Sequence, residues 1–423
     1  MKFFIYKPFY VILFVFCVNI IHAKQPIILQ NADSLVGISS DNLNIRNFIG
    51  NVSFSQGEIT LKCDTAIQYI EQNRVELMGN VIINRNNIEI RSPKIDYIGN
   101  EKLAYAYQFV QIRDLPTIIE ANSGTYNLET NTVHFNHCVK VENDSLVIFS
   151  DELIHNTDSD ESFAYGDVKL FGKMKLTAVI CDSLVYKPKM DFFLAYSNAG
   201  FYYIDTVKNL NELSFDTLSI HSNTIFGNQV KGREFYQFLE NVRIIRSSLY
   251  SKCNQADFFS SGDSLVLIGE PVVWYDSLQL FADTIVAFFP KQKIEKIELR
   301  NNSIAVSTND TSGIGKIDQI SGKDIDILFR QDSIRVIISK SQANSLYFIA
   351  GEDGEQSGFQ RSGADSIYIY FENNDVENIV WKSNPFMDFY PENIWSENLS
   401  EYYLPRFKIR YDRPKKRNFP TKE

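Results

Sequence analysis

Residues 50–66 read GNVSFSQGEITLKCDTA, and this stretch decides the fold class. Apolar and polar residues alternate in it, with Val52 and Phe54 near its start and Ile59 and Leu61 further on. Alternation of this kind is the period of a half-buried β-strand, because successive side chains of a strand point to opposite faces. The stretch therefore predicts strands with one apolar and one polar face.

Two short signals from this stretch recur along the chain. The first is a Gly-Asn or Gly-Asp pair followed by Val, at Gly50, Gly79 and Gly166, with looser copies at Glu240 and Gly269. Such pairs tolerate positive φ, so we expect each to form a tight reversal between strands. The second is an Asp with an apolar residue two places later, and we expect its side chain to cap a bend. It occurs at Asp33, Asp64, Asp151, Asp182, Asp216, Asp283 and Asp365.

With degenerate copies between them, these anchors recur about every 30 residues, and such a period indicates a repeat protein. A unit of this size cannot bury its own apolar face, so each rung must stack on its neighbours. Aromatic residues make up 13% of the chain, a composition that favours strands. We therefore expect one elongated all-β body over residues 24–385, with loops inserted around residues 309–313 and 351–355.

Alternation also predicts which side chains of the first rungs point inward. This face could be an ordinary closed core, as in a closed β-solenoid, or it could line an open groove, and the pattern alone leaves both alternatives open. The inward residues are Val52, Phe54, Ile59, Leu61, Val81, Ile83, Ile88, Ile90, Ile95 and Tyr97.

The two ends of the chain differ from the repeat body. Residues 1–23 combine Lys2 and Lys7 with an apolar run and end in a small-residue cleavage site, which predicts a cleaved signal peptide and export. Residues 386–423 carry several prolines and clustered Lys and Arg. They predict a basic tail that is either flexible or laid along the body, and whose role stays open.

Charge and composition narrow the function classes. A net charge of -10 argues against nucleic-acid binding, which needs clustered cations. His134 and His137 are three residues apart and would point to opposite faces of a strand, so no metal site is expected. No motif for a catalytic nucleophile or a cofactor is recognised, and we expect no enzyme and no cofactor. A carbohydrate-active β-helix enzyme with paired acidic residues is a further alternative interpretation of the repeat.

Four cysteines follow the expected cleavage site, and an exported protein permits disulfides among them. Four cysteines allow three pairings, so whether any disulfide forms is left open. The simpler interpretation is buried free thiols on strands. The four are Cys63, Cys138, Cys181 and Cys253.

With the rungs in view, the sequence resembles the OstA-like family of lipopolysaccharide-transport proteins, also described as the organic-solvent-tolerance or LptA-type family. The resemblance is strongest over residues 30–190 and looser over 191–385. The matching motifs are GNV at 50–52 with LKCDTA at 61–66, GNV at 79–81 with SPKIDY at 92–97, GDV at 166–168 with CDSLVY at 181–186, and ISGKDI at 320–325.

The resemblance implies a two-sheet β-jellyroll that opens along one side into a V-shaped groove for the acyl chains of lipopolysaccharide, without catalytic residues. The ten inward residues are then candidates for the groove lining. The protein would work in the periplasm, associated with the outer membrane or carrying lipid toward it. We also expect it to pair through its sheet edges with envelope transport proteins or with further copies. The alternative is a non-catalytic exported scaffold or adhesin.

Overall fold

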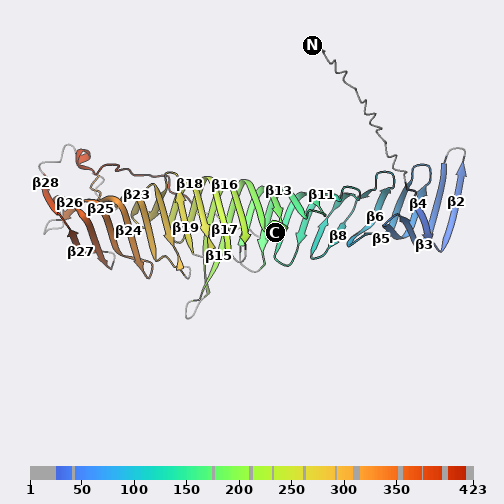
Figure 1. Ribbon diagram of the computed structural model, residues 1–423, viewed down its shortest axis with the longest axis horizontal. Coiled ribbons are helices and arrows are strands. Elements are labelled where there is room, and N and C mark those ends of the chain that lie inside the picture. The colour runs from blue at the N-terminus through green and yellow to red at the C-terminus, as the bar shows by residue number, and fades with distance from the viewer. Residues whose placement is uncertain are drawn as a thin grey trace, which may run out of the picture.

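The computed structural model describes residues 25–40, 43–173, 177–208, 213–230, 233–260, 263–290, 293–307, 315–350, 356–373, 375–392 and 399–415. The proposed signal peptide, the inserts expected at 309–313 and 351–355, and residues 416–423 of the tail lie outside these ranges. The strands pair side by side into one long antiparallel sheet, and the body is elongated (Figure 1). This confirms the predicted elongated all-β architecture.

The bounds of the strands follow in chain order. The first half comprises β1 (Ile28–Asn31), β2 (Ser34–Ser40), β3 (Leu43–Gln56), β4 (Ile59–Tyr69), β5 (Arg74–Arg85), β6 (Ile88–Ile98), β7 (Leu103–Ala106), β8 (Val110–Asp114), β9 (Thr117–Ala121), β10 (Ser123–Asn127), β11 (Thr132–Glu142), β12 (Leu146–Asn156), β13 (Glu161–Gly172) and β14 (Thr177–Lys187). The second half comprises β15 (Phe192–Lys208), β16 (Leu213–Val230), β17 (Arg233–Arg246), β18 (Leu249–Phe259), β19 (Ser264–Ile268), β20 (Val272–Tyr275), β21 (Leu278–Phe281), β22 (Thr284–Phe288), β23 (Lys296–Ser307), β24 (Gln319–Arg330), β25 (Ser333–Ala350), β26 (Gln356–Glu372), β27 (Asp375–Lys382) and β28 (Phe386–Pro391). Two 3-10 helices, η1 (Pro188–Met190) and η4 (Leu399–Tyr402), accompany them.

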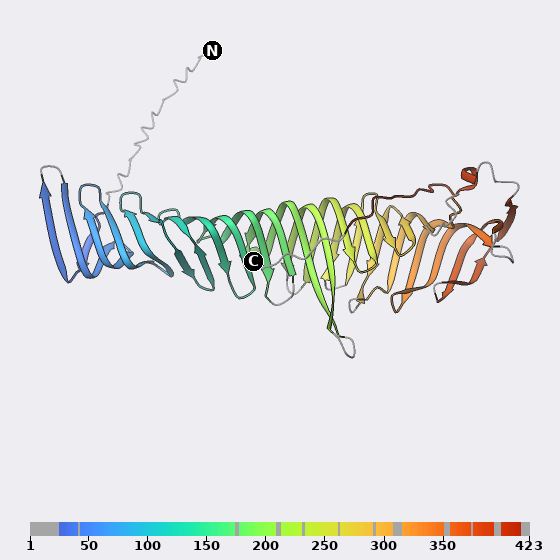
Figure 2. The same cartoon turned by 180° about the vertical axis from the view of Figure 1, so that it is seen from behind.

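The long strands bend sharply at their midpoints, and this bend folds the sheet into two layers. In β3 the register with β4 shifts between Ile49 and Val52. The rings of Phe48 and Phe54, on either side of the bend, lie 5.2 Å apart. Six residues of straight strand would span about 20 Å, so the two halves of β3 must face each other. Figure 2 shows the two layers running the length of the body.

The Gly-Asn and Gly-Asp pairs make these bends, which corrects one expectation. Gly50 and Asn51 both adopt positive φ, 79° and 49°, at the shift in β3, and Gly79 and Asn80 do so in β5. They are β-bulges inside strands and not reversals between strands, because two consecutive positive-φ residues kink a strand while it keeps its direction of travel. The line of bulges forms the corner at which the two layers meet.

The Asp signal supports the same corner from the neighbouring strand. The amide of Asn80 donates to the Asp64 carboxylate at 2.8 Å, and Asn51 donates to Asp33 at 2.9 Å. A Cβ added at Gly79 would lie 2.5 Å from the Asp64 carboxylate, so this position also needs glycine for space. The predicted capping role of these two Asp residues is therefore confirmed, with each capping the bulge of the next long strand.

We call the layer before each bulge the first layer and the layer after it the second layer. For β3 these are residues 43–49 and 52–56, and the hairpin turns at the two ends form two lips opposite the corner. One apolar core runs between the layers from Ile27 to Ile367, so every rung buries its face against its neighbours as predicted. Cys63, Cys181 and Cys253 are buried free thiols on strands, and Cys138 is an exposed one.

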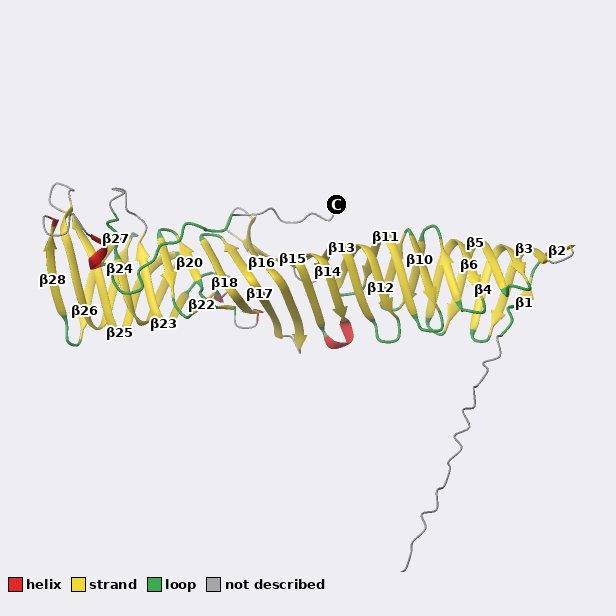
Figure 3. Ribbon diagram, turned by 90° about the horizontal axis from the view of Figure 1, so that it is seen from above, coloured by secondary structure: helices red, strands yellow, loops and turns green. Residues whose placement is uncertain are grey.

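The chain returns along its own body after β28. The segment of residues 399–415, which we call the C-terminal strap, starts with η4 and then runs extended over the outer surface of the second layer, from β26 back toward β16 (Figure 3). Leu404 of the strap is buried in a second core with Trp274, Phe348 and Phe359. Within the described residues, no helix is long and apolar enough to cross a membrane.

Candidate functional site

The space between the two layers is the candidate site, and all ten residues selected by alternation face it. Nine of them are buried, and Ile88 is partly buried against the same core. Burial in the core is compatible with a groove lining and with a closed sandwich, so their role in ligand binding stays a prediction. Their positions nevertheless show that the period-two pattern selects the inward face correctly.

The first rungs are packed shut. Among Ile90, Ile95, Ile112 and Phe135 the remaining gap is about 10 Å³. Such a gap has little or no room for even one water molecule. The ten candidate residues belong to the apolar core of this region, and nine of them are buried in it.

Hydrogen bonds across the lips close the same region. Gln56, on the lip of the second layer, donates through Nε2 to the carbonyl of Gly99 on the first-layer lip at 2.9 Å. The Tyr97 hydroxyl donates to the side-chain oxygen of Gln56, Oε1. Arg85 and Asn131 form a second link across the lips at 2.7 Å. The first rungs are therefore held closed by polar contacts as well as by packing.

Residues 25–27 lie between the lips at the first rung. The backbone N–H of Ile27 donates to the side-chain oxygen of Asn73 at 2.9 Å, and the Gln56 amide donates to the carbonyl of Gln25 at 2.6 Å. The Ile27 side chain is buried in the interior. This segment acts as a plug at the N-terminal end of the interlayer space.

Further along the body, the layers part around a central cavity of about 320 Å³. Its walls come from both layers and are mainly apolar and aromatic. The side-chain oxygen of Asn228, which also lines it, is buried without a hydrogen-bond partner among the described residues. Aromatic and aliphatic lining residues include Leu146, Leu170, Val179, Tyr186, Phe193 and Tyr236.

A second cavity, of about 450 Å³, lies between the layers near the C-terminal end. The first layer contributes an apolar wall with Ile334, Ile369 and Phe371. The second layer contributes more polar groups, among them Tyr347 and Asp318. Burial raises the pKa of Asp318 to about 6, although the backbone N–H of Phe348 donates to it and opposes this shift. The cavity is thus apolar on one side and titratable on the other.

Sequence reasoning missed the residues that line these two cavities. The signal for some of them was present, because residues 367–371 alternate as clearly as the first rungs do. The ten candidates lie instead in the rungs with the best-preserved turn signals. Those rungs are tightly packed, whereas the C-terminal cavity occurs where the repeat is looser.

Reactive groups near the interior are held in unreactive states. Burial lowers the pKa of His155 to about 4, so its ring is neutral at neutral pH beside the Ser162 hydroxyl, 3.0 Å away. Burial raises the pKa of the Cys63 thiol to about 11 and of the Cys181 thiol to about 12. Within the described residues, no group of three His, Cys, Asp or Glu side chains is placed to hold a metal ion. Among the described residues, neither of these thiols nor His155 is an activated nucleophile.

Comparison with known proteins finds a family match for the first part of the chain. Residues 24–178 match the family described as OstA-like protein, and no curated protein matches the chain. That family is one of envelope transport and binding proteins and is not enzymatic. The matched region covers the rungs from β1 to the start of β14. Residues 24–178 are therefore the part of the chain that is similar to the OstA-like protein family.

Proposed function

We propose that this protein is a periplasmic carrier that binds the acyl chains of lipopolysaccharide between its two layers and passes them along the body toward the outer membrane. The observation that carries the proposal is a single apolar interior that runs the length of the folded sheet and widens into two cavities lined from both layers. The OstA-like match of the first rungs supports the lipid class.

The physical advantage of such an interior is solvation. Each methylene moved from water into an apolar site contributes about 0.8 kcal/mol, so one twelve-carbon chain gains roughly 10 kcal/mol. A continuous apolar interior provides this favourable transfer free energy along the whole path of the lipid, and no chemical step is needed. The two cavities, about 320 and 450 Å³, fall in the usual size range of small-molecule sites.

Lipid in the first rungs requires the layers to separate, because those rungs are closed. Hydrogen bonds of Gln56 and Arg85 hold the lips together. The plug of residues 25–27 is held by a hydrogen bond of the Ile27 backbone and by the buried Ile27 side chain. Each hydrogen bond contributes about 0.5–1.5 kcal/mol net, which is small beside the gain from one acyl chain. In this proposal the ten candidate residues line the groove when the lips open.

The ends of the sheet supply the proposed contacts with envelope transport proteins or further copies. At the N-terminal edge, Leu35 and Val36 of β2 are 55% and 53% exposed. At the C-terminal edge, Phe386 and Phe389 of β28 are 48% and 53% exposed. An edge strand has unpaired backbone groups and invites a further strand, so exposed apolar side chains at both ends favour end-to-end pairing.

A photo-crosslinking side chain at Ile369 tests the carrier role in cells. Ile369 lines the C-terminal cavity, and its neighbour Tyr368 alternates to the opposite face and serves as the matched control. We expect lipopolysaccharide to be labelled from position 369 and not from position 368. Protein-internal products alone at 369, together with no lipid in the mass spectrum of the purified protein, would favour the scaffold or adhesin alternative.

A further inference from the structure

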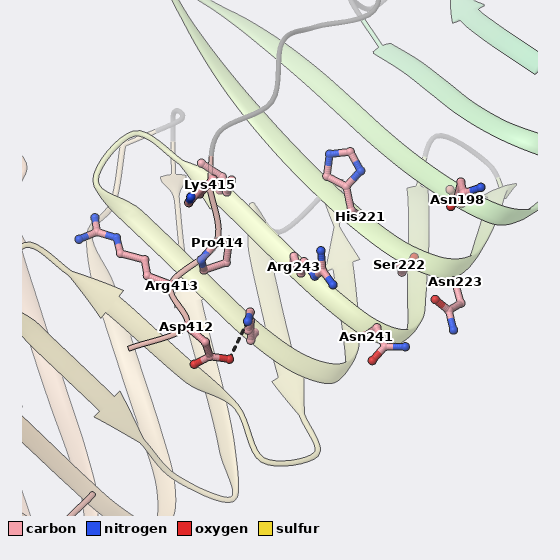
Figure 4. A pocket seen from close by; sticks show the side chains of 13 residues that line it. Asn198, His221, Ser222, Asn223, Asn241, Arg243, Asp412, Arg413, Pro414 and Lys415 are labelled. Atoms are coloured by element: carbon pink, nitrogen blue, oxygen red, sulfur yellow. Dashed lines mark hydrogen bonds and ion pairs between the residues drawn. The ribbon is translucent and has the colours of Figure 1, made fainter. Parts of the chain in front are cut away.

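A second hollow lies outside the interlayer space, on the outer surface of the second layer where the strap ends. It has a volume of about 560 Å³ and lies between the strands β15 to β18 on one side and the end of the strap on the other (Figure 4). A smaller hollow of about 310 Å³ shares Asn241, Arg243, Lys252 and Asp412 with it. We call the two together the outer trough.

The outer trough gathers cations from two distant parts of the chain. Arg243 and Lys252 come from the sheet, and Arg410, Arg413 and Lys415 come from the strap. Two acidic residues, Asp412 and Glu270, line it as well. A local surplus of positive charge on a protein with a net charge of -10 is a site of anion attraction.

Internal ion pairing accounts for two of the five cations. Asp412 lies 2.6 Å from the Lys252 ammonium and accepts from Nε of Arg410 at 2.9 Å, and these contacts hold its pKa well below the usual range. Arg413 lies over the ring of Tyr250, 3.8 Å from its centre. These contacts fix the end of the strap against the sheet.

Arg243 and Lys415 have no such partner. Both side chains are exposed, and neither forms an ion pair or hydrogen bond with another described residue. The Asn241 amide beside them is likewise unpaired within the described residues. Figure 4 shows Arg243 and Asn241 on the sheet side of the hollow and Lys415 on the strap side. Two unpaired cations and an amide thus face one hollow from opposite walls.

We propose that the outer trough binds a phosphorylated saccharide. A guanidinium and an ammonium are the usual partners of a phosphate group, and an amide can bond to sugar hydroxyls. A volume of about 560 Å³ exceeds what a bare phosphate needs and fits a ligand of sugar size. The saccharide can be free in solution or the headgroup of a lipid. The site is separate from the interlayer space and does not depend on acyl binding.

Titration calorimetry on the full chain tests this with glucosamine 1-phosphate, unphosphorylated glucosamine and inorganic phosphate. We expect glucosamine 1-phosphate to bind more tightly than either other probe, and its affinity to fall with salt. Phosphatidylglycerol vesicles, whose headgroup carries a phosphate but no sugar, form a separate arm, and retention by these vesicles with no binding of glucosamine 1-phosphate overturns the saccharide assignment. Binding of none of the phosphate probes, or equal binding of glucosamine, overturns the proposal.

Substitutions locate the binding. R243Q and K415Q should each weaken binding of glucosamine 1-phosphate about tenfold or more, because each removes one charge-assisted contact. K169Q is the matched control, since Lys169 follows the Gly166-Asp167-Val168 bulge as Arg243 follows Glu240-Asn241-Val242. An equal loss in K169Q overturns the proposal. Lipid bound between the layers should be unchanged in R243Q, which separates this test from that of the carrier role.

Discussion

The first rungs and the last rungs share the bulged corner, but the large apolar side chains of the second layer point inward in the first rungs and outward in the last rungs. In β3, Val52 and Phe54 point inward and Ser53 points outward. In β25, Ser345 and Tyr347 line the interlayer cavity, whereas Phe348 is buried under the strap. Apolar side chains directed inward close the N-terminal interior. Apolar side chains directed outward leave a partly polar cavity inside and create a surface that the strap must cover.

The largest expected effect of this difference is on stability. Phe54→Ala removes a fully buried ring from a closed interior, and we expect it to destabilise the first rungs by about 3–5 kcal/mol. Phe371→Ala, in the wall of the C-terminal cavity, should cost clearly less because its ring already borders open space. Hydrogen exchange resolved by segment measures both. Equal losses at the two positions would contradict the contrast in packing.

The next largest expected effect is on the local stability of the C-terminal strap. Leu404 is buried in the outer core, and its N–H donates to the side-chain oxygen of Gln319 at 2.9 Å. We expect Leu404→Ala to cost about 2–4 kcal/mol locally and to expose the strap to proteolysis. Arg406→Ala, at an exposed strap position, is the control. Cleavage of the strap at the wild-type rate in Leu404→Ala would show that the strap does not depend on this contact.

The two ends show what the sequence could and could not predict. Alternation and the phase of the anchors predicted the all-β body, the stacked rungs and the inward face of the first rungs, because these follow from local period. The prediction of reversals was wrong, since positive φ at Gly50 and Asn51 is compatible both with a tight turn between strands and with a bulge inside one strand. The cavities, and the choice between a flexible tail and one laid along the body, could not be predicted, because alternation does not say which face of residues 343–348 meets the interior.

The titratable wall of the C-terminal cavity predicts a pH effect. Burial raises the pKa of Asp318 in the folded protein from 3.8 to about 6, so the folded state holds its proton more tightly than the unfolded state does. Stability contributed by this group is present below about pH 4 and is lost as pH rises through about 6. Asp318→Asn should remove this loss of unfolding free energy, which is about 1–3 kcal/mol at pH 7.5.

Urea denaturation of wild type and Asp318→Asn at pH 5 and pH 7.5 measures this. Asn keeps an oxygen for the N–H of Phe348, so the substitution mainly removes the titration. The difference between the two proteins should grow at the higher pH. A difference of the same size at both pH values would show that the carboxyl is solvated in the folded protein.

The smallest expected effect concerns the lips of the first rungs. Weakening the contacts between these lips should make the closed N-terminal end open more often, so that it resembles the C-terminal end with its cavity. The double substitution Gln56→Leu and Tyr97→Phe removes the link that Gln56 makes across the lips, leaves the Arg85–Asn131 link in place, and leaves no Tyr97 hydroxyl unpaired. The loss of about 1 kcal/mol should shift the balance toward separated layers roughly fivefold. A crosslinking side chain at Ile90, which is 3% exposed, should then label lipopolysaccharide more strongly than in the wild-type background. Arg91, on the outer face of the same strand, should label little in either background, whereas unchanged labelling at Ile90 would mean that packing and not the lip contacts keeps these rungs shut.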